Sequence, residues 1–130
     1  MSRTKKEQTI KVLKVAPKRE PEVVYLDNSL RGFQEAVSIG APEVGLIEAL
    51  GLEPGVDLLL NEEGKLIPLE PNRRFNGDIL CGVFYVIGSN YDGDFCSLDD
   101  PIIQKYTEIF KNPEDIDPDE VEAFMKVFFF

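Results

Sequence analysis

The feature that most constrains the fold of this 130-residue chain is the apolar run from Ile79 to Ile87. Apolar side chains occupy both of its alternating faces. One set is Ile79, Cys81, Val83, Tyr85 and Ile87, and the other is Leu80, Phe84 and Val86 together with Gly82. A strand with neither face in water belongs in the middle of a sheet. The sequence therefore predicts a central strand over residues 79–87.

Composition and charge favour one small domain that does not bind nucleic acid directly. An apolar fraction of 43% is enough for a single core in a chain of this length. The net charge of −10 argues against a DNA or RNA partner, because phosphate neutralisation requires clustered Lys and Arg. No stretch approaches the roughly 20 apolar residues that cross a bilayer, so no membrane partner is expected.

The charges are unevenly distributed along the chain. Seven basic residues and one acidic residue lie between Met1 and Arg19, whereas Asp92 to Glu122 contains eleven acidic residues and two lysines. The simpler interpretation is a solvated basic end and a solvated acidic end. The alternative is that the acidic end imitates DNA and occupies the basic groove of a DNA-binding protein.

The absence of histidine removes the side chain most used for proton transfer near neutral pH and for zinc binding. Catalysis by a serine or cysteine paired with histidine is thereby excluded. Gly51 to Gly55 lacks the lysine of a phosphate-binding loop, so nucleotide hydrolysis has no support. We expect no enzymatic activity, no cofactor and no metal.

Cys81 and Cys96 are the only cysteines, and no apolar signal segment is found near Met1. This pattern favours a reducing, cytosolic compartment. Each thiol is expected to be a small core group. A redox pair remains an alternative if the two strands that carry them are neighbours.

Local patterns predict an α+β fold with a single mixed or antiparallel sheet, one helix after the first hairpin and two C-terminal helices. The expected elements are strands over 10–16, 22–26, 44–50, 56–60, 65–69 and 95–98, and helices over 29–38, 100–110 and 118–128. Asn61 to Gly64 is expected to form the hairpin turn between two of these strands. The predicted organisation is a flexible basic arm over 1–9, the α+β domain over 10–111 and an acidic, phenylalanine-rich C-terminal helix over 112–130.

Several separated motifs carry a family resemblance. They are Asn61-Glu62-Glu63-Gly64-Lys65, Pro71-Asn72-Arg73, Asp78 to Phe84 with Gly82, and Phe95-Cys96-Ser97-Leu98 before the helix that contains Tyr106. With these in order, the chain from about Ile10 to Phe110 resembles the family known as domain of unknown function 3846. The resemblance implies a small protein or module of bacteria, phages or mobile elements, sometimes beside antirestriction-type domains, for which no catalytic residues are assigned. The Asn90–Asp94 turn and the acidic tail depart from the usual pattern.

The strongest polar constellation is formed by five side chains, which we interpret as a candidate ligand site: Asn61, Asn72, Arg73, Arg74 and Asp78. Consecutive guanidinium groups in a loop after a strand can bind a phosphate or carboxylate, and asparagine can bind a base or amide edge. The simpler interpretation is that one arginine pairs with Asp78 or Glu70 while the other lies in solvent.

The C-terminal helix contains apolar residues suited to an interface, namely Phe124, Phe128, Phe129 and Phe130. Docking on the domain's own sheet is the simplest explanation, and a homodimer contact is the next. The carboxylates from Glu114 to Glu120 suit the N-terminus of this helix.

Together these observations favour a non-enzymatic binding protein of phage or mobile-element type in the bacterial cytosol. It would sequester a small anionic molecule or nucleotide, or block a host protein, consistent with a role against host defence. The alternative hypothesis is an acidic, DNA-mimic-like inhibitor of a DNA-processing or restriction enzyme.

Overall fold

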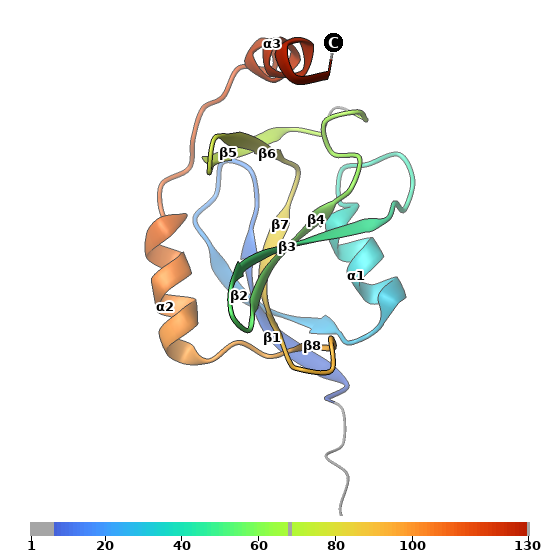
Figure 1. Ribbon diagram of the computed structural model, residues 1–130, viewed down its shortest axis with the longest axis vertical. Coiled ribbons are helices and arrows are strands. Elements are labelled where there is room, and N and C mark those ends of the chain that lie inside the picture. The colour runs from blue at the N-terminus through green and yellow to red at the C-terminus, as the bar shows by residue number, and fades with distance from the viewer. Residues whose placement is uncertain (1–6, 68, 130) are drawn as a thin grey trace, which may run out of the picture.

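The structure is a computed structural model that describes residues 7–67 and 69–129, with side chains up to Lys126. It confirms the predicted α+β class: a six-stranded antiparallel sheet and a separate two-stranded sheet, with three helices (Figure 1). The elements in chain order are β1 (Thr9–Val15), β2 (Glu22–Asp27), α1 (Leu30–Val37), β3 (Ile47–Glu53), β4 (Val56–Asn61), β5 (Pro71–Phe75), β6 (Asp78–Cys81), β7 (Phe84–Ser89), β8 (Phe95–Cys96), α2 (Asp100–Ile109) and α3 (Pro118–Phe129).

The core lies on both faces of the larger sheet, whose strand order is β2-β1-β7-β4-β3, with β8 paired to β7. Phe84 and Val86 of β7 pack in the cluster that contains Phe110 beside α2. Tyr85 and Ile87 pack in the opposite cluster, which includes residues of α1. Figure 1 shows α1 and α2 on opposite sides of the sheet. The central position of β7 follows from this double burial.

The predicted continuous strand over 79–87 is wrong, because the chain breaks at Gly82. Residues before the break form β6, which pairs with β5 in the small sheet, and residues after it form β7. Gly82 adopts φ +79°, and its N–H donates to the carbonyl oxygen of Glu70 at 2.7 Å. Periodicity does not reveal such a break, since both halves are equally apolar.

The expected hairpin through Asn61–Gly64 is also wrong, since residues 65–67 and 69 form no strand. The N–H of Ile67 donates to the Glu63 carbonyl, and that of Leu69 to the Gly64 carbonyl, so the segment coils back on itself. β4 instead pairs with β3 and β7. The hairpin of this region is β3–β4, whose turn contains Gly55 at φ +80°. β3 accordingly starts and ends three residues later than predicted.

Asn72–Arg74 was expected as a loop, but it forms the middle of β5. The hairpin that joins β5 to β6 turns at Asn76 and Gly77, which have φ of 50° and 75°. Positive φ at both central positions is the type I′ turn that Asn-Gly favours. This signal is present in the sequence and would have predicted the β5–β6 hairpin.

The three predicted helices are confirmed. Ser29 caps α1, because its hydroxyl oxygen accepts from the Gly32 N–H at 3.0 Å. α3 lies at the end of an extended segment that follows α2, against the β5–β6 hairpin (Figure 1). Ile116 and Val121 are buried there with Leu69, Ile79 and Cys81. Burial of these two side chains contributes about 3–6 kcal/mol to holding the helix.

Gly82→Ala tests the break between β6 and β7. An added Cβ would lie 2.7 Å from Leu69 Cδ1, and the alanine would have to keep a backbone φ of +79°. We expect a loss of about 2–4 kcal/mol in the free energy of unfolding, measured by urea denaturation. Gly93→Ala is the matched control, because Gly93 has φ +83° and nothing within 4 Å of its Cβ position. Equal losses in the two variants would contradict the steric account.

Candidate functional site

The sequence-predicted residues Asn72, Arg73 and Arg74 lie on β5, where a bulge changes the direction of their side chains. Pro71 pairs with Cys81 and Arg73 with Leu80, so that Asn72 is the extra residue. Asn72 and Arg73 are both buried, with exposed fractions of 0% and 1%. Arg74 faces outward. The paired arginines therefore do not form one cationic fork.

Protein oxygen atoms accept hydrogen bonds from all five N–H groups of the Arg73 guanidinium. Nε and Nη2 donate to the Phe110 carbonyl at 3.2 and 2.9 Å, and Nη2 also donates to the Arg19 carbonyl at 2.6 Å. Nη1 donates to Oδ1 of Asn72 at 2.7 Å and to its carbonyl at 3.4 Å. In this arrangement Arg73 has no donor left for a ligand.

Arg73 thereby joins three separate segments of the chain. Phe110 is the C-cap of α2, so the cation lies where the negative end of the helix dipole favours it. Arg19 belongs to the β1–β2 connection. Burial lowers the pKa of Arg73 from its usual value, and the charge of Glu114 opposes that effect. The charge of this buried group is stabilised mainly by carbonyl dipoles.

Asn72 completes the buried network. Its Nδ2 donates to the Val15 carbonyl at 2.9 Å and to the Gly82 carbonyl at 2.8 Å, while its Oδ1 accepts from Arg73. It therefore links the end of β1 to the break between β6 and β7.

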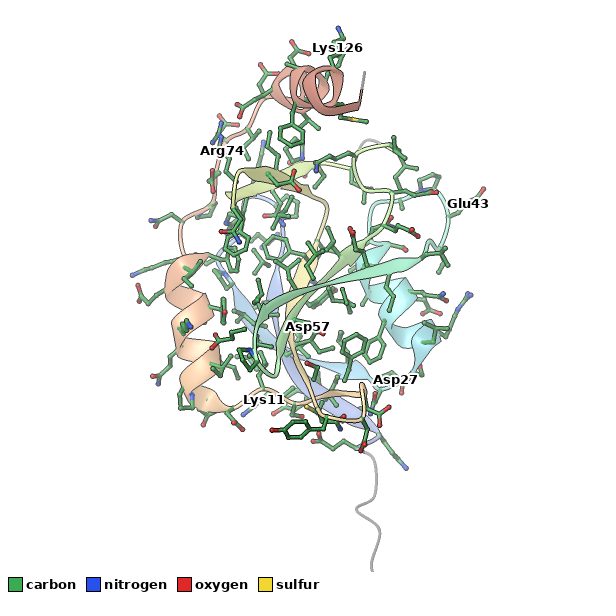
Figure 2. All side chains as sticks on the ribbon, viewed as in Figure 1. Lys11, Asp27, Glu43, Asp57, Arg74 and Lys126 are labelled. Atoms are coloured by element: carbon green, nitrogen blue, oxygen red, sulfur yellow. The ribbon has the colours of Figure 1, made fainter. Side chains whose placement is uncertain are left out.

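Arg74 binds two carboxylates of the C-terminal segment, beside α3 in Figure 2. Its Nε and Nη2 donate to the two oxygens of Glu120 at 3.0 and 2.7 Å, and its Nη1 donates to Glu114 at 3.0 Å. These hydrogen bonds raise the pKa of Arg74 and lower that of Glu120. The sequence had suggested Asp78 or Glu70 as the partner of an arginine, but those acids pair with Lys65 and Lys18.

Asn61 and Asp78 lie apart from this network. Asn61 is buried and accepts from the Glu63 N–H at 2.8 Å, which holds the coiled loop after β4. Asp78 pairs with Lys65 and accepts from the Ile79 N–H at 2.7 Å. The structure thus brings Asn72 and Arg73 together, directs Arg74 to the C-terminal segment and uses Asn61 and Asp78 elsewhere.

The interface prediction can be followed only for Phe124. Its ring lies under the Lys65 ammonium, with 5.0 Å between Nζ and the ring centroid. The side chains of Phe128 and Phe129, and the whole of Phe130, are outside the described residues.

The two cysteines are free thiols on different sheets, Cys81 in β6 and Cys96 in β8. Burial raises the pKa of the Cys81 thiol to about 11, and burial also raises that of Cys96. Both groups are protonated near neutral pH and are weak nucleophiles.

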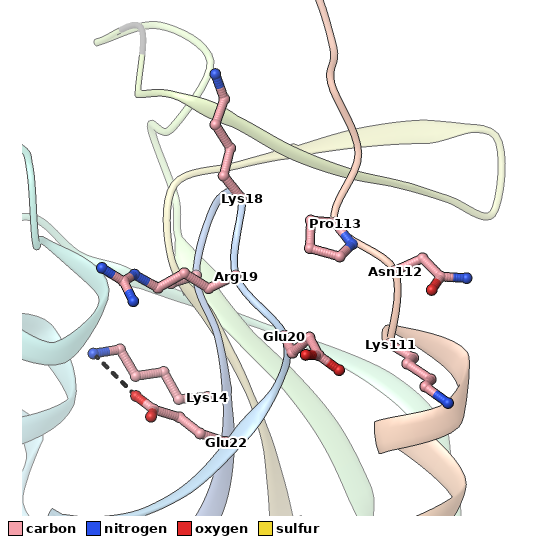
Figure 3. A pocket seen from close by; sticks show the side chains of 9 residues that line it. Lys14, Lys18, Arg19, Glu20, Glu22, Lys111, Asn112 and Pro113 are labelled. Carbon is pink, nitrogen blue, oxygen red and sulfur yellow. Dashed lines mark ion pairs between the residues drawn. The ribbon is translucent and has the colours of Figure 1, made fainter.

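A hollow of about 610 Å³ lies around the connection between β1 and β2 (Figure 3). We call it the hairpin cleft. Four cationic and two acidic side chains line it, together with three uncharged residues, and the full set is Lys14, Ala16, Lys18, Arg19, Glu20, Glu22, Lys111, Asn112 and Pro113. This is an excess of positive charge in a protein whose net charge is −10.

The cations of the hairpin cleft are only loosely engaged within the protein. Lys14 lies 4.0 Å from Glu22, and Lys18 lies 3.7 Å from Glu70 with 64% of its side chain exposed. Among the described residues, neither the guanidinium of Arg19 nor the ammonium of Lys111 has a hydrogen-bond or ion-pair partner. Exposed pairs of this kind contribute at most about 1 kcal/mol, so an anion can displace them at low cost.

Figure 3 shows how the side chains divide around the hairpin. Lys14 and Arg19 extend to one side and Glu20 and Lys111 to the other, while Lys18 lies at the tip. On the side of Lys14 and Arg19 the cleft continues into a second hollow of about 630 Å³, whose lining includes the apolar residues Ile39, Leu69 and Val83.

The turn at the tip of the hairpin has a strained backbone. The Arg19 N–H donates to the Ala16 carbonyl at 3.2 Å, with Pro17 and Lys18 between them. Lys18 has φ 62°, and a proline followed by a positive φ defines a type II turn. Glycine or asparagine is the usual residue at this position, and another residue costs about 1–2 kcal/mol. Strain of this kind is concentrated at functional sites.

The sequence reasoning missed Lys14, Lys18, Arg19 and Lys111 as candidate binding residues. The available signal was the concentration of basic residues in the first 19 positions, which was interpreted as a solvated end. A lysine after proline within a turn was the second signal.

The model of the family described as Domain of unknown function (DUF3846) matches residues 10–111. The chain belongs to this family. No curated protein and no solved structure matches it. The DUF3846 region contains the whole sheet from Ile10 onward with α1 and α2, whereas α3 lies beyond its matched boundary.

Within residues 7–67 and 69–129, no group of three metal-ligating side chains was found. In the same residues, no helix has the length and apolar character needed to span a bilayer.

Arg73→Lys tests whether the buried guanidinium joins the three segments. Lysine cannot reach all of its acceptors, so carbonyl oxygens are left without donors inside the protein. We expect the free energy of unfolding to fall by about 3 kcal/mol or more in urea denaturation. Arg74→Lys is the control on the next residue, for which an exposed ion pair predicts a loss of about 1 kcal/mol or less. Comparable losses would show that Arg73 has no special structural role.

Proposed function

We propose that this DUF3846 protein is a non-enzymatic binding protein that holds a small anionic molecule, such as a nucleotide, in the hairpin cleft. The observation that carries the proposal is the strained turn at Lys18. A lysine occupies a position that favours glycine, and it lines the cleft together with three further cations. Retaining a cation there at an energetic cost is understandable if the charge binds a ligand.

Preorganisation supports the same proposal. The carbonyl of Arg19 accepts from the buried Arg73 at 2.6 Å, so the turn is fixed to the domain although its side chains are exposed. A fixed backbone beneath these side chains leaves less conformational entropy to be lost on binding. The size of the hollow lies within the range of about 300–1,000 Å³ typical of small-molecule sites.

Electrostatics favours the hairpin cleft over other surfaces for an anion. The protein as a whole carries a net charge of −10, so a local excess of cations is where a negative ligand is favoured. An anion near the turn meets Lys14 and Arg19 on one side, with Lys18 at the tip. The adjoining hollow offers Ile39, Leu69 and Val83 to an apolar portion such as a base. In biological terms, this would be a phage or mobile-element protein that sequesters such a ligand in the cytosol of a bacterium.

The alternative of an acidic inhibitor has less support from the geometry. Glu114 and Glu120 are already paired with Arg74, and Asp117 accepts from the Asp119 N–H at the start of α3. These carboxylates therefore stabilise the protein's own C-terminal segment. A salt-sensitive complex with a basic enzyme that is lost on neutralising Asp115 and Asp119 would favour the alternative.

Arg19→Ala tests the binding proposal. Isothermal titration calorimetry with pyrophosphate and a panel of nucleoside phosphates is expected to detect binding to the wild type. Loss of one close charge–charge hydrogen bond predicts affinity at least about tenfold weaker in the variant. Arg31→Ala is the matched control, because Arg31 is an exposed arginine that lies outside the cleft and pairs with Glu35. The absence of binding by the wild type to every probe would refute the proposal.

Lys18→Gly separates stability from function. Glycine relieves the strain of the positive φ, but it also increases the conformational entropy of the unfolded chain. The net effect expected is a rise of about 0.5–1 kcal/mol in the free energy of unfolding. The same change removes a cation, so anion affinity should fall. Lys18→Ala is expected to lose the same affinity without the gain in stability. If Lys18→Gly kept full affinity, Lys18 would not belong to the site.

A further inference from the structure

The second hollow, next to the hairpin cleft, combines an apolar wall with a carboxylate. Three aliphatic side chains form the apolar wall, namely Ile39, Leu69 and Val83. Glu70 lines the same hollow but not the hairpin cleft, whereas Lys14 and Arg19 line both. A single ligand can therefore contact these cations with one end and the apolar wall with the other.

The apolar wall is suited to a flat ring. Leu69 and Val83 are buried, with exposed fractions of 6% and 3%, so the surrounding core fixes their positions. Ile39 follows the C-cap of α1, and 54% of it is exposed. An aromatic ring in the hollow removes this aliphatic surface from water, which favours binding.

Glu70 presents its carboxylate from a fixed backbone. Its carbonyl oxygen accepts from the Gly82 N–H at 2.7 Å, and the preceding residue, Leu69, is buried. Among the described residues, the partner of the carboxylate is the Lys18 ammonium, at 3.7 Å. This separation exceeds the length of a hydrogen bond, so both carboxylate oxygens remain able to accept one.

A carboxylate does not favour a bare phosphate as the ligand, because it weakens the attraction of the neighbouring cations for an anion. Its position becomes favourable when the ligand also carries N–H donors, since hydrogen bonds to a carboxylate are strong. Glu22 is the other carboxylate of the second hollow, but it lines the hairpin cleft as well and lies 4.0 Å from Lys14. Glu70 follows Leu69 of the apolar wall and is therefore the carboxylate placed to meet a ring.

We propose that the second hollow holds the base of a guanosine phosphate and that Glu70 selects guanine, an inference that rests on the binding function proposed above. The phosphates contact Lys14, Lys18 and Arg19, and the apolar wall covers the ring. Glu70 accepts hydrogen bonds from the edge of the base.

The choice of guanine follows from the donors that each base presents. Guanine has two neighbouring donors on its Watson–Crick edge, the N1–H and the 2-amino group, which match the two oxygens of one carboxylate. Adenine and cytosine place a ring nitrogen acceptor beside their amino group, and uracil places its N–H between two carbonyl oxygens. An acceptor that faces a carboxylate oxygen is repelled, so these bases fit less well.

Little is lost within the protein when such a ligand binds. The contact between Lys18 and Glu70 is an exposed ion pair without a hydrogen bond, which contributes little to stability. A guanosine phosphate replaces both of its halves, because the phosphate pairs with Lys18 while the base donates to Glu70. Neither charge is left without a partner.

The test compares four probes by isothermal titration calorimetry with the full-length protein: GDP, IDP, ADP and pyrophosphate. IDP differs from GDP only by the absence of the 2-amino group. We expect GDP to bind at least about tenfold more tightly than ADP, with IDP between them. This comparison is made on the wild type and does not depend on the folding of a variant.

Glu70→Gln tests the role of the carboxylate. Glutamine offers one donor and one acceptor, which both adenine and guanine can match. The ratio of GDP to ADP affinity is therefore expected to fall to about threefold or less, while the affinity for pyrophosphate is not reduced. Glu48→Gln is the matched control, because it removes the same charge from an exposed residue of β3 outside both hollows. The control should keep the ratio of the wild type.

The outcomes separate this inference from the binding function on which it rests. Equal affinities of the wild type for GDP and ADP overturn the selection of guanine and leave the anion-binding proposal intact. A Glu70→Gln variant that keeps the wild-type ratio has the same consequence, as does binding of pyrophosphate without binding of any nucleotide. Failure of all four probes to bind overturns both proposals.

Discussion

The buried guanidinium of Arg73 is the interaction on which the rest of the structure depends. It connects β5, the carboxyl end of α2 and the turn between β1 and β2 through five donated hydrogen bonds. A cation without solvent requires every donor to be matched, because an unmatched one is costly in a low-dielectric interior. The three segments therefore have little freedom to move independently. The hydrogen bond from Arg73 to the Arg19 carbonyl also fixes the backbone of the turn that contains Lys18 and Arg19.

Much of the fold was predictable because local rules decide it. Caps and amphipathic stripes placed the three helices, and the doubly apolar strand correctly indicated the middle of the sheet. The errors arose where a single backbone angle overrides periodicity. Gly82 breaks one apolar run into strands of two different sheets, and Asn76 with Gly77 starts a hairpin inside an expected loop. Hydropathy carries no information about such breaks, although the Asn-Gly pair does.

The candidate site was less predictable than the fold. Arg73 and Arg74 look equivalent in the sequence, yet the bulge at Asn72 buries the first and exposes the second. Whether an arginine is a binding residue or a structural one depends on which oxygen atoms surround it, and for Arg73 two of the acceptors, the Phe110 and Arg19 carbonyls, lie 37 and 54 residues away. The fold likewise brings Lys111 next to Lys14, Lys18 and Arg19, which are far from it in the sequence. Spacing along the chain cannot reveal these contacts.

α3 lies beyond the matched family region, which ends at residue 111. The segment nevertheless completes a buried cluster, because Ile116 and Val121 cover Leu69, Ile79 and Cys81. A chain shortened at residue 111 would expose those three apolar side chains and leave Arg74 without its two carboxylates. The matched region alone therefore leaves an apolar surface on the β5–β6 hairpin that other residues would have to shield from water.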